Sequence, residues 1–246
     1  FILRQLTFSD FLMGLYLVVI FTVDEMYRNN FALIIASWQT NYVCQMAAFI
    51  NFISSQTSLF LETFVACSRA QFIIWRQLYS LSNMKRVISL IVCIVSIVFS
   101  SVLSFLIPYF NNGRLTINNN MCLLFGSTLQ YKMTVIEVVL YIIYILFNSI
   151  CLLLILCSYI AIYHALSQRR NGILGKSFNE DISNQSVLKR VFLLILTNFL
   201  TWLPILVVLL MALCGINVYE ETFLWIAAFL IPINSCVNPI MYTIST

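Results

Sequence analysis

The sequence predicts an all-α fold, a bundle of helices that span a membrane. Of the 246 residues, 61% are hydrophobic and only 9% are charged, whereas a water-soluble domain of this size carries about 25% charged residues. Such an apolar surplus cannot fit into one soluble core, so lipid must be the solvent. The apolar stretches lack strict alternation, which favours helices because a helix closes its own backbone hydrogen bonds. We therefore exclude a cytosolic enzyme, a nucleic-acid-binding protein and an extracellular disulfide scaffold.

Six apolar stretches are long enough to span a bilayer, which takes about 20 helical residues. The predicted spans are roughly 5–23, 41–73, 87–109, 133–166, 187–214 and 222–243. Together they make the whole chain, residues 1–246, one transmembrane domain.

Short polar segments end the spans in turn. The first span ends at 24–38, the second before 74–86, and the third at the asparagine-rich tract 111–121. The fourth ends before 167–186 and the fifth before 215–221. These segments are the predicted loops.

The positive charges orient the bundle. With Phe1 on the cytoplasmic side, that side collects ten of the 13 Lys and Arg residues. The outer side keeps only Arg28, Arg114 and Lys132. Because cytoplasmic loops are enriched in Lys and Arg, we expect both ends of the chain in the cytoplasm. The chain begins at Phe1 without a signal-peptide pattern, and we interpret it as a segment with something missing upstream.

Two of the eight cysteines are predicted to form a disulfide. Cys44 begins the second span on the outer side, and Cys122 lies in the outer loop after the third span. Both face the oxidising compartment, where a bridge persists. The alternative is two unpaired thiols, and Cys214 is a weaker third candidate.

Polar residues inside the spans are candidates for function, because a polar group in lipid is costly without a partner. Such residues lie on the first, second and last spans: Asp10, Ser58, Asn234, Ser235 and Asn238. One carboxylate among neutral oxygens and amides can hold a hydrated monovalent cation, or act as a hydrogen-bond hub. The alternative is a helix-packing network without further function.

Prolines mark two spans as kinked. On the fifth span, Asn198 and Trp202 are four residues apart, and Pro204 follows them. On the last span, Pro239 removes a backbone donor and Tyr242 lies on the polar face.

Glu62 and Glu137 are the other acids in the predicted spans. Glu62 lies within two turns of Arg69, toward which it can fold, and we assign neither acid a role.

Several motifs, in this order, resemble a rhodopsin-type G-protein-coupled receptor. Leu6–Asp10 resembles the polar motif of the family's second helix, and Cys44 and Arg69 resemble the cysteine and arginine of its third. Trp202 with Pro204 resembles the sixth-helix motif, and Asn238–Tyr242 matches Asn-Pro-x-x-Tyr in full. The resemblance covers Leu6 to Ile244 and implies six of the family's seven transmembrane helices, with the first one missing.

A finer resemblance is to the leucine-rich-repeat-containing receptors for glycoprotein hormones and relaxin-type peptides. The segments Asp10–Leu17 and Pro232–Pro239 are similar to their second and seventh helices. The fourth span lacks a proline, as in this subfamily, and Tyr159 fits its pattern. The sequence departs from the family at Ser68-Arg69-Ala70, where an acid, an arginine and an aromatic residue are usual.

The resemblance implies a hormone receptor of the plasma membrane with no enzymatic activity. It implies that binding of an extracellular peptide or protein hormone is passed to a cytoplasmic heterotrimeric G protein, and that nucleic acid is not a partner. By family analogy, a sodium ion in the polar core favours the inactive state, and no other cofactor is expected. The implied switch comprises Asn198, Trp202, Pro204, Pro239 and Tyr242, with Arg69 and Tyr159 on the G-protein side.

Two other functions compete with this one. A receptor-like protein that no longer signals is consistent with the altered Ser68-Arg69-Ala70. A six-helix transporter would require inverted repeats or helices interrupted by glycine, and the sequence has only six glycines.

Overall fold

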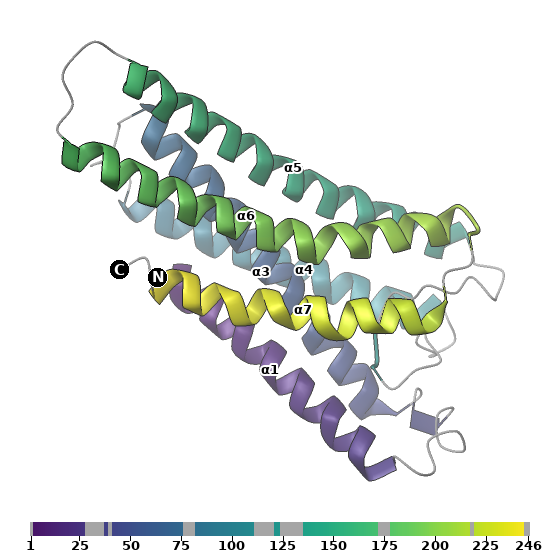
Figure 1. Cartoon of the computed structure of the whole chain (residues 1–246). Coiled ribbons are helices and arrows are strands. Elements are labelled where there is room, and N and C mark those ends of the chain that lie inside the picture. The colour runs from purple at the N-terminus through teal and green to yellow at the C-terminus, as the bar shows by residue number, and fades with distance from the viewer. Residues whose placement is uncertain are drawn as a thin grey trace.

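The computed structural model describes residues 2–27, 37–38, 41–75, 82–110, 121–123, 135–171, 178–216 and 219–243. In these ranges the long elements are six helices: α1 (Ile2–Tyr27), α3 (Tyr42–Trp75), α4 (Ser82–Phe110), α5 (Val135–Asn171), α6 (Phe178–Leu213) and α7 (Glu220–Thr243). They lie lengthwise against one another in one elongated bundle (Figure 1). The predicted all-α class is confirmed for the described residues.

The helices overlap the predicted spans but run beyond several of them. The largest difference is at the predicted loop 167–186, where α5 continues to Asn171 and α6 begins at Phe178. Polarity ends a membrane span but does not end a helix, because the helix backbone satisfies its own hydrogen bonds in water as well as in lipid. The membrane-spanning part and the helical part of a segment are therefore different lengths.

Three helical stretches within the described residues are long and apolar enough to cross a bilayer. They are Arg4–Tyr27, Val138–Ala165 and Leu196–Leu213, with mean hydropathies of 2.0, 2.7 and 2.1. Shorter apolar stretches lie in α4 (Cys93–Leu103) and in α7 (Leu224–Val237).

Helix α3 is absent from that set because it is the most polar helix inside the bundle. It packs against α1, α4 and α5, and it buries Ser54, Gln56, Ser58 and Glu62. A helix surrounded by other helices can carry polar residues, since they face protein and not lipid. The outer faces are apolar instead, as the exposed Phe11 of α1 shows.

Defined caps end the helices where the chain turns. The side-chain oxygen of Asn41 accepts a hydrogen bond from the backbone N–H of Val43, 3.0 Å away, which caps the start of α3. At the end of α6, Gly215 adopts a φ of 75°, a conformation that glycine reaches without steric cost. The N–H of Gly215 bonds to the carbonyl of Ala212, and that of Ile216 to Met211, the pattern of a Schellman cap.

Candidate functional site

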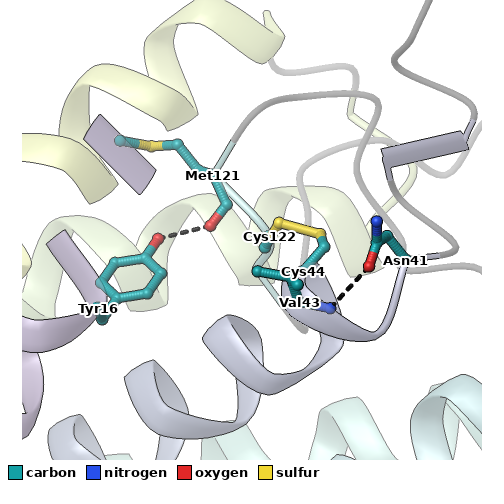
Figure 2. Close-up of a disulfide and its surroundings, with 6 residues drawn as sticks. All are labelled: Tyr16, Asn41, Val43, Cys44, Met121 and Cys122. Atoms are coloured by element: carbon teal, nitrogen blue, oxygen red, sulfur yellow. Dashed lines mark hydrogen bonds between the residues drawn. A yellow bond between two sulfur atoms is a disulfide. The ribbon is translucent and has the colours of Figure 1, made fainter. Parts of the chain in front are cut away.

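A disulfide joins the start of α3 to the loop segment 121–123. Cys44 and Cys122 are 78 residues apart in sequence, and their Cα atoms are 5.3 Å apart. Figure 2 shows the bridge beside the capped start of α3. The predicted pairing is confirmed, and Cys214, the weaker candidate, is a free and exposed thiol.

The same loop segment is also tied to α1. The hydroxyl of Tyr16 donates a hydrogen bond to the backbone carbonyl of Met121, 2.5 Å away (Figure 2). Because Cys122 is bonded to α3 and Met121 to α1, the segment is held across the end of the bundle between these helices. Leu123 is buried there.

A small cavity lies against this segment. It has a volume of about 10 Å³, enough for about one water molecule. Met121 and Leu123 line it with residues of α1, α3 and α7, among them Tyr16, Asn51 and Ile231. Asn51 brings a buried side-chain oxygen that has no hydrogen-bond partner among the described residues. One water in the cavity would supply that partner.

The polar core of the bundle is built on Glu62. Its Oε1 atom accepts a hydrogen bond from the hydroxyl of Ser58, 3.1 Å away on the same helix. The same atom accepts a second one from the side-chain N–H of Asn234 on α7, also at 3.1 Å. All three residues are buried, at 2% exposure for Ser58, 5% for Glu62 and 4% for Asn234.

The core therefore contains a residue to which the sequence analysis assigned no role. Ser58 and Asn234 were predicted to share a site, and the structure brings them together on the carboxylate of Glu62. The sequence analysis expected Glu62 to fold toward Arg69 and did not predict its contacts with Ser58 and Asn234. The four-residue spacing of Ser58 and Glu62, which places them on one helix face, was the available signal.

The structure describes only some of the side chains of the other predicted core residues. The carboxylate oxygens of Asp10 are buried within the bundle, and Ser235 is half-buried on α7. The side chain of Asn238 lies outside the described residues, as do those of Pro239 and Tyr242. The backbone of these three residues belongs to α7.

The predicted switch on α6 faces the interior. Asn198 and Trp202 are both buried and lie one turn apart on the same face. Pro204 stands inside the helix, where its ring removes one backbone N–H and weakens the ladder of helical hydrogen bonds. The indole Nε1 of Trp202 is buried with no hydrogen-bond partner in the described part of the chain.

At the other end of the bundle, Arg69 on α3 and Tyr159 on α5 are half-buried. Cys67 precedes Arg69 by two residues and Ser158 directly precedes Tyr159. The hydroxyl of Ser158 lies 3.5 Å from the sulfur of Cys67. This contact brings the two helices together at one level. Arg69 and Tyr159 are therefore at similar depth on neighbouring helices.

A second polar cluster joins α3 to α5. The side-chain N–H group of Gln56 lies 3.3 Å from the Oδ1 of Asn148 and 3.4 Å from the hydroxyl of Tyr144. Asn148 also donates to the backbone carbonyl of Tyr144. The sequence analysis did not select Gln56, although a glutamine in the middle of a predicted span meets the criterion of a costly polar group in lipid.

Comparisons with known proteins agree with this architecture. Residues 1–242 match the family model described as 7 transmembrane receptor (rhodopsin family). The chain is 29% identical over 256 residues to G-protein coupled receptor GRL101 of Lymnaea stagnalis, covering 100% of the chain and 22% of that protein. It is 26% identical over 259 residues to Relaxin receptor 2 of Homo sapiens, covering 99% of the chain and 32% of that protein.

A third relative is Leucine-rich repeat-containing G-protein coupled receptor 5 of Xenopus tropicalis. It is 29% identical over 236 residues, covering 94% of the chain and 24% of that protein. The chain thus spans less than a third of the length of these relatives. They confirm the predicted resemblance to leucine-rich-repeat-containing receptors.

The family model covers almost the entire chain, and the apolar helices make this a multi-pass membrane protein. The chain belongs to the seven-transmembrane receptors of the rhodopsin family.

Proposed function

We propose that this domain transmits the binding of an extracellular peptide or protein hormone to a cytoplasmic heterotrimeric G protein by rearranging its helices. The observation that carries the proposal is the buried polar contact between α3 and α7, made by Glu62 and Asn234. This hydrogen bond is a discrete contact between two helices, so it can be made in one arrangement of the bundle and broken in another.

The class of ligand is supported by the relatives. Two relatives are relaxin receptors of Mus musculus and Homo sapiens, matched over 97% and 99% of the chain. The chain covers at most 32% of either relative. We therefore propose that parts of the protein outside this domain capture the hormone.

The mechanism requires two arrangements that differ in their affinity for the outer ligand and the inner partner. Hormone binding on the outer side acts on the segment 121–123, which the disulfide and Tyr16 hold against α3 and α1. Pro204 supplies a weak point at which α6 can bend. In this proposal, Arg69 and Tyr159 rearrange when a G protein binds at the inner end of the bundle.

We place the domain in the plasma membrane with both chain ends in the cytoplasm. The start of α1 and the end of α7 lie at the same end of the bundle (Figure 1). The disulfide is at the start of α3, which follows the far end of α1. Because disulfides persist in oxidising compartments, that end faces outward and the termini face inward.

We propose that a sodium ion binds in the same core. Asn234 directs its N–H group to Glu62, and its buried Oδ1 has no hydrogen-bond partner among the described residues. Neutral oxygens beside a carboxylate are suitable ligands for a hard cation. We propose that Asp10, Ser58, Asn234, Ser235 and Asn238 hold sodium, which would supply positive charge to the resting state.

Nucleotide exchange tests the proposed function. The full-length protein is placed in lipid nanodiscs with purified heterotrimeric G proteins, and hormone-free GTP-analogue binding is compared with empty nanodiscs. Exchange above the empty nanodiscs supports a signalling receptor. No exchange with any heterotrimer, with or without relaxin-type peptides, would favour the second candidate, a receptor-like protein without signalling. The altered Ser68-Arg69-Ala70 is the observation that favours this candidate.

A further inference from the structure

The carboxylate of Glu62 forms a direct link between α3 and α7. One oxygen accepts hydrogen bonds from Ser58 on its own helix and from Asn234 on α7, each at 3.1 Å. Glu62 and Asn234 are 172 residues apart in the chain. The link therefore depends on the folded bundle and not on local helix geometry.

The rest of the bundle shows why this link matters. Among the described residues, α7 packs mainly against α6 and α1, whereas α3 packs mainly against α1, α4 and α5. Within the described part of the chain, backbone packing between α3 and α7 is slight at most. The buried bond between Glu62 and Asn234 therefore connects two helices that otherwise meet mainly through their neighbours.

The orientation of the Asn234 amide shows which groups face each other. Its N–H group donates to Glu62, and its oxygen points elsewhere. A flipped amide would place its oxygen beside the carboxylate oxygen, and two acceptors repel each other. The bond is shielded from water because both side chains are buried, and in a low-dielectric interior a hydrogen bond is electrostatically stronger than in water.

We propose that Glu62 is a positioning residue that latches α7 to α3 through Asn234. Asn234 lies one helical turn before Asn238 and Pro239 on α7. Holding Asn234 therefore holds the part of α7 that leads to the inner end of the bundle. The signalling consequence rests on the proposed function: opening the latch releases α7 and raises signalling without hormone.

Four variants of the full-length protein separate the latch from simple packing. Glu62→Gln keeps a side-chain oxygen that can accept both hydrogen bonds, whereas Glu62→Leu removes the acceptor at similar volume. Asn234→Ala removes the donor, and the double variant Glu62→Leu with Asn234→Ala removes both. Glu221→Gln is the matched control, because Glu221 is an exposed acid on α7.

The first readout needs no G protein. Unfolding temperatures of the purified variants in detergent are combined in a double-mutant cycle. We expect the shift of the double variant to be clearly smaller than the sum of the two single shifts, since each single change already breaks the link. Additive shifts would overturn the latch, whatever the protein does in signalling. Should the Leu variant fail to fold, Glu62→Ala, which also removes the acceptor, takes its place in the cycle.

The second readout is hormone-free nucleotide exchange per folded receptor. We expect Glu62→Leu and Asn234→Ala to raise exchange about fivefold, the low end of the usual coupling between two sites. Glu221→Gln should stay near the unmodified protein, and Glu62→Gln should raise exchange less than Glu62→Leu does. A purely structural role would lower stability without raising exchange, and that result would overturn the signalling role. Coupled unfolding with no exchange in any protein would support the latch as a helix contact and contradict the proposed function.

Discussion

Ser9 and Ser54 exchange a reciprocal pair of hydrogen bonds between α1 and α3. The hydroxyl of each donates to the backbone carbonyl of the other, at 2.7 Å in both directions. Both residues are buried, and their small side chains let the two helix backbones approach closely. Asp10 follows Ser9 directly, so this pair fixes the height and rotation of α1 at which Asp10 enters the bundle.

We expect each of Ser9→Ala and Ser54→Ala to lower the free energy of unfolding by about 0.6 kcal/mol, the average for interhelical hydrogen bonds in membranes. Each change removes one donor and leaves the other bond in place, so the double variant should lose about twice as much. Denaturant unfolding in mixed micelles measures both. Thr22→Ala is the control, because that exposed hydroxyl bonds within α1 only. A double variant no less stable than Thr22→Ala would contradict a stabilising role for the Ser9–Ser54 pair.

The disulfide should contribute to folding of the outer end. Replacing both Cys44 and Cys122 by serine removes a crosslink that closes a long loop, and we expect a loss of about 2–4 kcal/mol in unfolding free energy. The unfolding temperature with and without reductant measures it, and the reductant should have no effect on the double variant. Cys214→Ser, at a free exposed thiol, should match the unmodified protein. Equal stability of all three proteins would argue against a stabilising crosslink.

Trp202 should be the most sensitive position on α6. It is 3% exposed, so Trp202→Ala leaves a cavity, and we expect a loss of about 3–5 kcal/mol. Trp202→Phe keeps most of the packing and removes an indole N–H that has no partner among the described residues, so its cost should be much smaller. Trp225→Ala is the control, since Trp225 is 64% exposed on α7. Equal losses for Trp202→Ala and Trp225→Ala in thermal unfolding would refute this ranking.

Sodium dependence tests the ion in the polar core. Asp10→Asn removes a formal charge at nearly constant volume, so a bound cation should lose most of its attraction. We expect hormone-free nucleotide exchange of the unmodified protein to fall when sodium chloride replaces potassium chloride at constant ionic strength. Exchange by the Asp10→Asn variant should be indifferent to the salt. Equal sodium dependence of the two proteins would remove the ion from the mechanism.

The path of the chain through the membrane was predictable in advance. Apolar stretches of spanning length located every long helix among the described residues, because in lipid a backbone must close its hydrogen bonds locally. The disulfide was predictable for a related reason: only Cys44, Cys122 and Cys214 were placed on the outer side, which limited the choice of partners. Helix ends were less accurate, as the extension of α5 and α6 beyond the predicted spans shows.

The centre of the polar core was not predictable in the same way. Asp10 was selected as a polar residue inside a predicted span, and it also lies in a motif that resembles a known family. Glu62 lay outside any motif and was expected to fold toward Arg69. The periodicity of α3 places Glu62 on the face of Ser58, but it says nothing of which helix stands opposite. Only the packing of α7 brings Asn234 to that face.

The amino-acid sequence alone determined that this protein lies in lipid and where its long helices run, and it predicted which two cysteines pair. These are properties of segments, and each segment carries its own hydrophobicity and charge. Only the folded bundle decided which polar residues form hydrogen bonds between helices: Ser9 with Ser54, Gln56 with Asn148, and Glu62 with Asn234. Such contacts depend on the rotation and depth of each helix against its neighbours, which the packing of all the side chains settles together.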